Sequence, residues 1–176
     1  DGIFDELVRP EWPAVRTAGG GDSRAHTVLI GLRSIMVAEP DSEWVLVHDA
    51  ARPCISQDCL VGLIRQAVAS EHGAILAVPV SDTLKWAGED GCIERTVDRS
   101  HCWAAQTPQV FRVWDLAANL QKALDAGLRP TDEAAAMEQA GIRPLLVEGG
   151  RGNIKVTGTG DLALAEFILQ HQRIQG

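Results

Sequence analysis

The stretch that decides the fold class is Trp44-Val45-Leu46-Val47-His48-Asp49-Ala50-Ala51-Arg52-Pro53. Its apolar residues 44–47 are typical of a strand that is buried on both faces of a parallel sheet. The strand ends at His48 and Asp49, and Arg52 follows at a turn closed by Pro53. Ligands of open α/β sheets bind just beyond the carboxyl ends of the strands. A carboxylate and a guanidinium at such an edge suit a phosphorylated ligand with hydroxyl groups, together with its metal. The alternative is a structural Asp–Arg pair at a strand end.

The composition of the chain is that of an ordinary globular protein. It has 176 residues, of which 45% are hydrophobic and 23% charged, and we expect residues 1–176 to form one domain with a substantial core. The formal net charge of −8 argues against a nucleic-acid surface, although local cations can still bind a small anion. No apolar run approaches the roughly 18 residues of a membrane span, and the first residues of the sequence lack the apolar core of a signal peptide. We therefore expect neither nucleic acid nor membrane as a partner.

The four cysteines are scattered, at positions 54, 59, 92 and 102, and none form a CxxC pair. This spacing disfavours a structural zinc site and fits reduced thiols in a cytoplasmic protein. The chain begins with Asp1 rather than Met, and its first strong strand comes late. We expect that an N-terminal segment of the natural protein precedes it.

Strands and helices are expected to alternate on both sides of the opening stretch. Further strands are predicted at residues 14–17, 74–80, 145–147 and 154–156. Helices are predicted from a cap at Asp22 or Ser23, from Ser56 to near residue 73, over 116–124, from Thr131 to Gly141 and over 161–171. This order predicts an α/β domain with a mostly parallel sheet flanked by helices.

Residues 81–101 interrupt the alternation and are predicted to form a β-hairpin, here called the arm. The turn Gly88-Glu89-Asp90-Gly91 is flanked by two strand-like segments, 83–86 and 93–97. Because an isolated hairpin is only marginally stable, we expect the arm to pack on another subunit.

Other segments offer candidate ligands for an anion, and each has a structural alternative. Gly19-Gly20-Gly21 precedes a helix whose N-terminus favours anions, and Arg24 and Thr27 lie one turn inside it, but tight turns need glycine anyway. Thr131-Asp132-Glu133 is a standard helix start with Thr131 as cap, yet it offers donors to a phosphate or polyol.

Two cations complete the candidate site. Lys155 lies between apolar neighbours in a short predicted strand, where packing does not require a lysine, and it would face the same crevice as Asp49 and Arg52. Arg99 by itself would be half of a surface pair with Asp98. The residues alone thus indicate an enzyme of nucleotides or sugar phosphates.

Several motifs occur in one order along the chain and together resemble a known family. They are Gly20-Gly21-Asp22-Ser23-Arg24, residues 47–53, Asp82-Thr83, Thr96-Val97-Asp98-Arg99, Gln106-Thr107-Pro108-Gln109, Thr131-Asp132-Glu133 and Asn153-Ile154-Lys155-Val156-Thr157. From about Ala18 onward, the chain resembles the 2-C-methyl-D-erythritol 4-phosphate cytidylyltransferases of the non-mevalonate isoprenoid pathway.

The resemblance implies a Rossmann-like nucleotidyltransferase domain whose arm interlocks a homodimer. The implied reaction joins CTP and methylerythritol phosphate to give the CDP-linked alcohol and pyrophosphate, with Mg²⁺ held mainly by the CTP phosphates. Catalysis would rest on positioning and electrostatics without a covalent nucleophile.

The resemblance also implies roles for individual residues. On the nucleotide side, Gly21, Asp22 and Thr27 match cytosine-binding positions, and Asp49 and Ala50 match ribose-side positions. Arg24 is added to the nucleotide side from its place one turn inside the helix, from which its side chain would point to the same ligand. On the alcohol side the matched residues are Asp49, Arg52, Thr83, Arg99, Thr131 and Lys155. Lys155 and Arg99 would orient the attacking phosphate, with Arg99 and Thr83 reaching in from the partner's arm.

The chain lacks the family's glycine-rich first loop, which we expect upstream of Asp1, so these 176 residues alone are expected to have doubtful activity.

Two alternative functions remain open from the sequence. A cytidylyltransferase for another polyol phosphate, such as ribitol 5-phosphate, would share the fold and the CTP site. A non-catalytic binding protein on a decayed enzyme fold is the alternative of another class.

Overall fold

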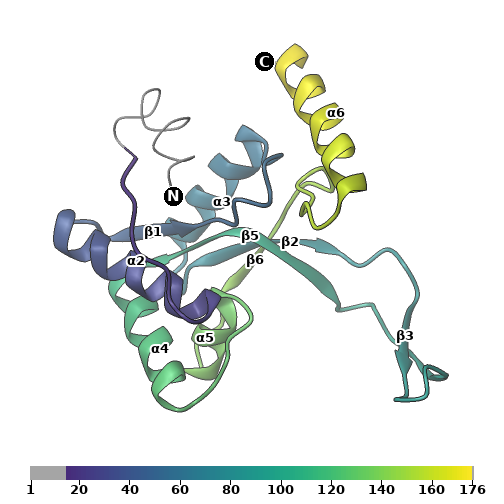
Figure 1. Cartoon of the computed structure of the whole chain (residues 1–176), viewed down its shortest axis with the longest axis horizontal. Coiled ribbons are helices and arrows are strands. Elements are labelled where there is room, and N and C mark those ends of the chain that lie inside the picture. Colours follow the sequence, from purple (N-terminus) through teal and green to yellow (C-terminus); the bar gives the residue numbers. More distant parts are fainter. Residues whose placement is uncertain (1–14, 176) are drawn as a thin grey trace.

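The computed structural model describes residues 15–175 (Figure 1). The elements, in chain order, are α2 (Arg24–Ala38), β1 (Trp44–Val47), α3 (Gln57–Ala69), β2 (Ala74–Pro79), β3 (Leu84–Ala87), β4 (Ile93–Val97), β5 (Trp103–Arg112), α4 (Val113–Asp125), α5 (Glu133–Gln139), β6 (Leu145–Glu148) and α6 (Thr159–Gln175). Most of the predicted helices and strands are therefore confirmed.

The main sheet has four strands in the order β1-β5-β2-β6. Strands β1, β2 and β6 run in one direction, as predicted, and β2 pairs with β6 in parallel. Strand β5, which the sequence reading did not predict, runs antiparallel between β1 and β2. The described sheet is therefore mixed. The pattern missed β5 because buried polar residues such as Gln106, Thr107 and Gln109 interrupt its apolar residues.

Alternating side chains of the sheet build one core on each face. Ile75 and Phe111 belong to the cluster that α2, α4 and α5 cover, whereas their chain neighbours Leu76 and Val110 belong to the cluster under α3. Figure 1 shows α3 on one side of the sheet and α2, α4 and α5 on the other. The helices thus hold the sheet from both faces and leave its strand ends accessible.

The helix ends follow the predicted chemistry, with one correction. Ser23 caps α2 by accepting a hydrogen bond from the amide of His26, and Ser56 caps α3 in the same way. Helix α5 is capped by Asp132, whose side chain accepts from the amide of Ala135. The prediction of Thr131 as the cap was wrong by one residue.

Two predicted strands are absent from the described structure. Residues 15–17 are not in a strand, and Ala14, the first residue of that prediction, lies outside the described residues. Residues 154–156 lie in an irregular loop between β6 and α6, because their amides bond to loop carbonyls: Ile154 to Gly152 and Val156 to Ala51.

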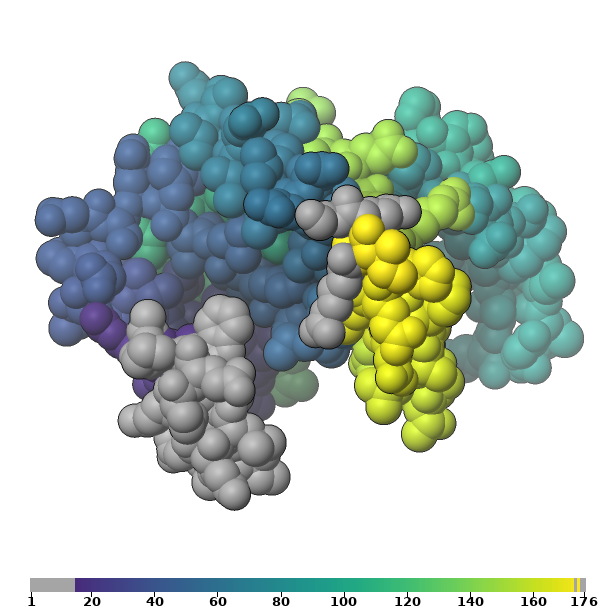
Figure 2. Space-filling model, turned by 90° about the horizontal axis from the view of Figure 1, so that it is seen from above, coloured from purple at the N-terminus to yellow at the C-terminus, as the bar shows by residue number. Residues whose placement is uncertain are grey.

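The arm is present as predicted. Strands β3 and β4 pair antiparallel as a separate two-stranded sheet that projects from the main body (Figure 1). Figure 2 shows α6 at the surface between that body and the arm. No helix within residues 15–175 combines the length and apolar character needed to cross a membrane.

Candidate functional site

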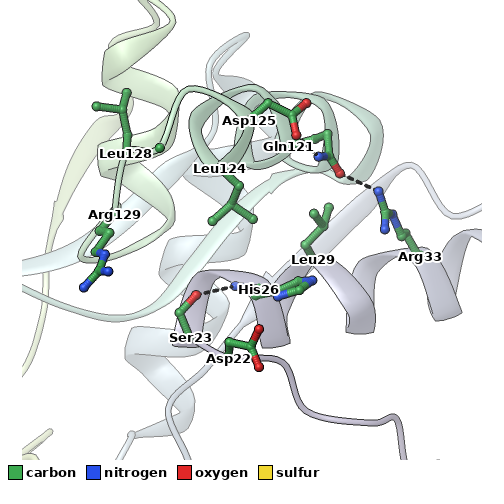
Figure 3. A pocket seen from close by; sticks show the side chains of 11 residues that line it. Asp22, Ser23, His26, Leu29, Arg33, Gln121, Leu124, Asp125, Leu128 and Arg129 are labelled. Carbon is green, nitrogen blue, oxygen red and sulfur yellow. Dashed lines mark hydrogen bonds between the residues drawn. The ribbon is translucent and has the colours of Figure 1, made fainter.

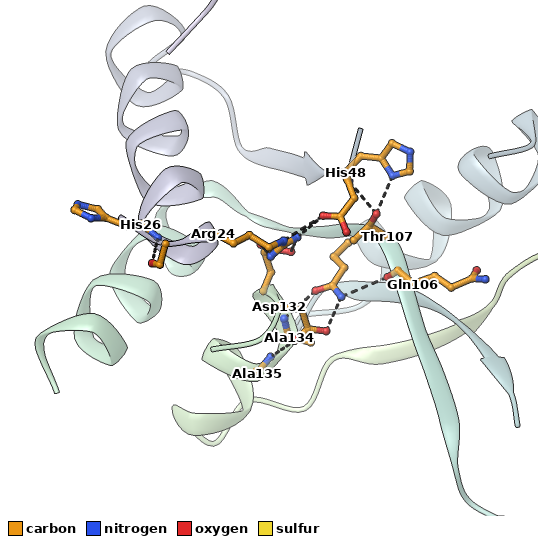
Figure 4. Close-up of polar contacts among 12 residues, drawn as sticks. Arg24, His26, His48, Gln106, Thr107, Asp132, Ala134 and Ala135 are labelled. Atoms are coloured by element: carbon orange, nitrogen blue, oxygen red, sulfur yellow. Dashed lines mark hydrogen bonds and ion pairs between the residues drawn. The ribbon is translucent and has the colours of Figure 1, made fainter. Parts of the chain in front are cut away.

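Four charged side chains from separate parts of the chain meet at the carboxyl end of β1. Asp49 follows β1, Arg24 begins α2, Glu133 begins α5, and Lys155 lies in the loop after β6. We call these four residues the Asp49 cluster. Figure 4 shows Arg24 reaching from its helix toward the strand end beside His48 and Thr107. The structure thus confirms that Lys155 and Asp49 lie together.

Asp49 is held by a cation on each of its oxygens. Arg24 Nη2 lies 2.9 Å from Oδ1, and Lys155 Nζ lies 2.9 Å from Oδ2. Burial of the carboxyl by itself raises the pKa of Asp49, but the hydrogen bonds and charges of Lys155 and Arg24 outweigh it and lower that pKa below its usual value. Asp49 is therefore ionised at neutral pH, with a side chain only 17% exposed.

Arg24 is fixed by a second carboxylate on its other side. Its Nη1 and Nη2 donate to the two oxygens of Glu133, at 2.7 and 3.0 Å. Burial by itself lowers the pKa of Arg24. The hydrogen bonds and charges of Glu133 and Asp49 outweigh this effect, so the pKa of Arg24 is raised above its usual value. Arg24 is consequently a permanent cation between two carboxylates.

Arg52 lies close to the Asp49 cluster and donates a hydrogen bond to the loop that carries Lys155, residues 149–158, here called the Lys155 loop. Its Nη1 donates to the carbonyl of Asn153 at 2.8 Å, and its Nε is buried without a hydrogen-bond partner in the described structure. Burial lowers the pKa of Arg52, and the charge of Asp49 partly offsets this effect. An arginine stays protonated under such shifts, so Arg52 adds a second fixed cation near Asp49.

A chain of hydrogen bonds fixes the backbone around Asp49. Its amide donates to Thr107 Oγ1 at 2.9 Å, and Thr107 Oγ1 lies 3.1 Å from His48 Nδ1. His48 Nε2 lies 2.9 Å from the carbonyl of Arg52. Because that carbonyl only accepts, we assign the ring proton to Nε2, which leaves Nδ1 to accept from the Thr107 hydroxyl. The chain ties β5 to the turn after β1.

Buried amides hold the loop that carries Lys155. Asn153 is 2% exposed and donates to the carbonyl of Thr107 at 2.9 Å and to Gln106 Oε1 at 3.3 Å. At the far end of the loop, Asp161 accepts hydrogen bonds from Thr157 and from the amide of Gly158. These bonds set the path of the loop in place of the predicted strand.

The residues predicted for the cytosine side gather at the start of α2. The amide of Gly21 donates to Thr27 Oγ1 at 3.0 Å, and a Cβ at Gly21 would lie 2.6 Å from the ring of His26. A larger residue there would therefore displace either the His26 side chain or the loop. Asp22 and Ala50 are exposed.

A hollow of about 630 Å³ lies between the start of α2 and the end of α4 (Figure 3). Asp22, Ser23, His26 and Arg129 are among the residues that line it, whereas Asp49 and Lys155 are not. Of the predicted site, the hollow therefore includes only Asp22.

Three predicted residues are not brought to the Asp49 cluster by hydrogen bonds within the described chain. Arg99 donates to the carbonyl of Val80 at the base of the arm, at 2.6 Å, and Thr83 is exposed in the arm. Thr131 is exposed beside the cap of α5. Their assigned roles stay predictions.

The sequence reading missed four residues that build the site: His48, Thr107, Glu133 and Asn153. His48, Thr107 and Asn153 were predicted only as parts of motifs, without a role of their own. Glu133 was read as a favourable acid in the first turn of a helix. Complete burial of a carboxylate needs a charged partner, but no local pattern in the sequence reveals that burial.

Comparisons with known proteins agree with this picture. The chain matches the model of the family described as IspD, 2-C-methyl-D-erythritol 4-phosphate cytidylyltransferase, over residues 2–171. Curated relatives of that name include those of Tolumonas auensis, 49% identical over 99% of this chain and 75% of the relative, and Citrobacter koseri, 50% identical over 96% and 72%. A crystal structure described as 4-diphosphocytidyl-2C-methyl-D-erythritol synthase superimposes with a TM-score of 0.83 at 42% identity, over 94% of this chain and 77% of that one.

The fold and the strand-end site therefore define an α/β protein of the nucleotidyltransferase class. The chain belongs to the 2-C-methyl-D-erythritol 4-phosphate cytidylyltransferase family.

Proposed function

We propose that this protein transfers CMP from CTP to 2-C-methyl-D-erythritol 4-phosphate, giving 4-diphosphocytidyl-2-C-methyl-D-erythritol and pyrophosphate. The observation that carries the proposal is the Asp49 cluster at a strand end, in a chain of this family. An ionised carboxylate suits sugar or polyol hydroxyl groups, and the adjacent cations suit phosphates. Both kinds of group are present in each substrate.

The reaction joins two anions, so the protein must offset their repulsion and align them. A phosphate oxygen of the alcohol attacks the α-phosphorus of CTP, and the bond from that phosphorus to the bridging oxygen breaks as pyrophosphate leaves. Lys155 is 46% exposed and held only by Asp49 among the described contacts, so its ammonium group can bind the attacking phosphate. Arg52 adds fixed positive charge, and Asp49 accepts hydrogen bonds from substrate hydroxyls.

The residues present fit a magnesium ion that enters with CTP. No group of three His, Cys, Asp or Glu side chains within residues 15–175 is arranged to hold a metal. Mg²⁺ keeps several of its waters and is commonly held through substrate phosphates, so the CTP phosphates would supply most of its ligands. When bound, the ion would neutralise charge on the triphosphate.

The proposal includes a homodimer in which the arm of one subunit completes the site of the other. Its support is that the arm projects from the helix-covered body (Figure 1) and carries Thr83 and, at its base, Arg99. We also propose a cytoplasmic location, because the four cysteines are free thiols.

The test is turnover by the purified protein of natural length. CTP and Mg²⁺ would be supplied with either methylerythritol phosphate or ribitol 5-phosphate, and pyrophosphate release would be measured. We expect turnover with methylerythritol phosphate and a much lower kcat/KM with ribitol 5-phosphate. A folded protein that turns over neither alcohol would support the non-catalytic alternative, and a preference for ribitol 5-phosphate would overturn the substrate assignment.

A further inference from the structure

Glu133 is a completely buried carboxylate that the proposed reaction does not use. Its side chain is 0% exposed, although it is the first residue of the short helix α5. Burying an ionised carboxylate is costly unless a charged partner compensates it. The partner is Arg24, which approaches from α2, 109 residues away in the sequence.

Every nitrogen of the Arg24 guanidinium is occupied. Nη1 and Nη2 donate to Glu133, while Nε and Nη2 donate to Asp49 Oδ1 at 3.1 and 2.9 Å. These bonds use four of the five N–H donors of Arg24, and the second N–H of Nη1 is the one without a described partner. Because four donors bind carboxylates, the arrangement argues that Arg24 acts mainly through Asp49.

We propose that Glu133 and Arg24 form a buried clamp that orients Asp49, and through it Lys155, for the transfer reaction. The inference rests on the proposed function and assigns Glu133 as a positioning residue. Glu133 holds the planar guanidinium of Arg24 through Nη1 and Nη2. The guanidinium in turn holds Asp49 Oδ1 in one orientation through Nε and Nη2. Oδ2 is then directed at Lys155 Nζ, 2.9 Å away.

Charge balance supports the same arrangement. Arg24, Lys155 and Arg52 contribute three positive charges around Asp49, and Asp49 and Glu133 contribute two negative charges. Loss of Glu133 would leave Arg24 with Asp49 as its only carboxylate. The arginine would then be free to rotate about its long side chain, and Asp49 would follow it.

The test replaces both members of the clamp at once. Substituting a buried ion pair by apolar residues of similar size is often neutral for stability, so Arg24→Met/Glu133→Met separates positioning from folding. We expect a thermal midpoint close to that of the parent protein and a kcat/KM for methylerythritol phosphate reduced by about 100-fold, the usual cost of a misplaced reacting group. The control is Arg16→Met/Glu39→Met, which removes an exposed ion pair (side chains 69% and 60% exposed) and should change neither quantity.

A pH readout distinguishes the clamp from a structural pair. The groups that face Asp49 are Arg24 from α2, Lys155 and Arg52 from loops, and the Thr107 hydroxyl from β5, with Glu133 behind Arg24. Without Arg24 the Asp49 carboxylate loses a cation, so its titration, followed by ¹³C NMR, should move to higher pH. The acidic limb of the kcat/KM profile should move with it.

The outcomes are separable. Absence of turnover by the parent protein would refute the proposed function, and the NMR titration would still test the clamp. Normal parent turnover, with kcat/KM and titration unchanged in the double variant, would overturn the clamp alone. If the double variant does not fold, Arg24→Lys keeps the charge but loses the planar fork; it should lower kcat/KM at least 10-fold, and unchanged kcat/KM would refute the clamp.

Discussion

Replacing Lys155 with alanine should separate its catalytic contribution from its contribution to stability. The ammonium group makes one described contact, to Asp49 Oδ2, and the side chain is 46% exposed. Ion pairs this exposed contribute about 1 kcal/mol or less to stability. We therefore expect the free energy of unfolding to fall by no more than about 1 kcal/mol.

The expected effect on catalysis is larger. A unit charge about 4 Å from another near a protein surface contributes roughly 4 kcal/mol, and removal of one preorganised donor typically costs about 2.7–4 kcal/mol. At about 1.4 kcal/mol per tenfold, kcat/KM should fall by about 100-fold or more. Lys155→Arg should also be poor, because a planar fork does not replace a compact ammonium group.

The assay is pyrophosphate release under saturating CTP, with urea unfolding measured on the same preparation. Lys122→Ala is the matched control, because Lys122 is an exposed lysine in the last turn of α4 whose side chain has no described hydrogen bond or ion pair to the Asp49 cluster. It should leave both quantities unchanged. Turnover by Lys155→Ala within a few-fold of the parent, in a folded protein, would remove Lys155 from the mechanism.

Three further predictions concern Asp49 and the arm. Asp49→Ala should raise the KM for CTP and weaken use of the alcohol phosphate; a lower unfolding midpoint with normal kinetics of the folded fraction would instead make Asp49 structural. The pKa of Asp49 is lowered in the folded state, so its contribution to stability is complete above the unfolded pKa of about 3.9 and is lost as pH falls through the lower folded value. Asp49→Asn should therefore flatten the acid dependence of the urea unfolding free energy, and an unchanged slope would contradict this. Finally, Arg99→Ala and Lys155→Ala chains should each be nearly inactive alone, but mixed subunits should regain about a quarter of normal activity, since half the dimers carry one intact site. Verified subunit exchange without recovery would refute the shared site.

Local patterns in the sequence were sufficient for most of the elements. Four apolar residues predicted β1, spaced apolar residues and Ser23 predicted α2, and the turn at 88–91 predicted the arm. These signals depend on neighbours within a few residues, as caps, turns and periodicity do. Asp49 and Lys155 could be singled out in the same way, because each is a charged residue at the edge of an apolar segment.

The arrangement of the site was decided by tertiary structure alone. Strand β5 brings Thr107 within hydrogen-bond distance of the amide of Asp49, 58 residues away in the sequence. Helix α5 brings Glu133 to Arg24, 109 residues away. Lys155 reaches Asp49 from a loop rather than a strand, since buried Asn153 sets the path of its backbone. The local sequence around a carboxylate in the first turn of a helix is the same whether the side chain faces water or a buried arginine. Which of the two it meets depends on the packing of α2, α4 and α5 against one face of the sheet, and no local pattern contains that packing.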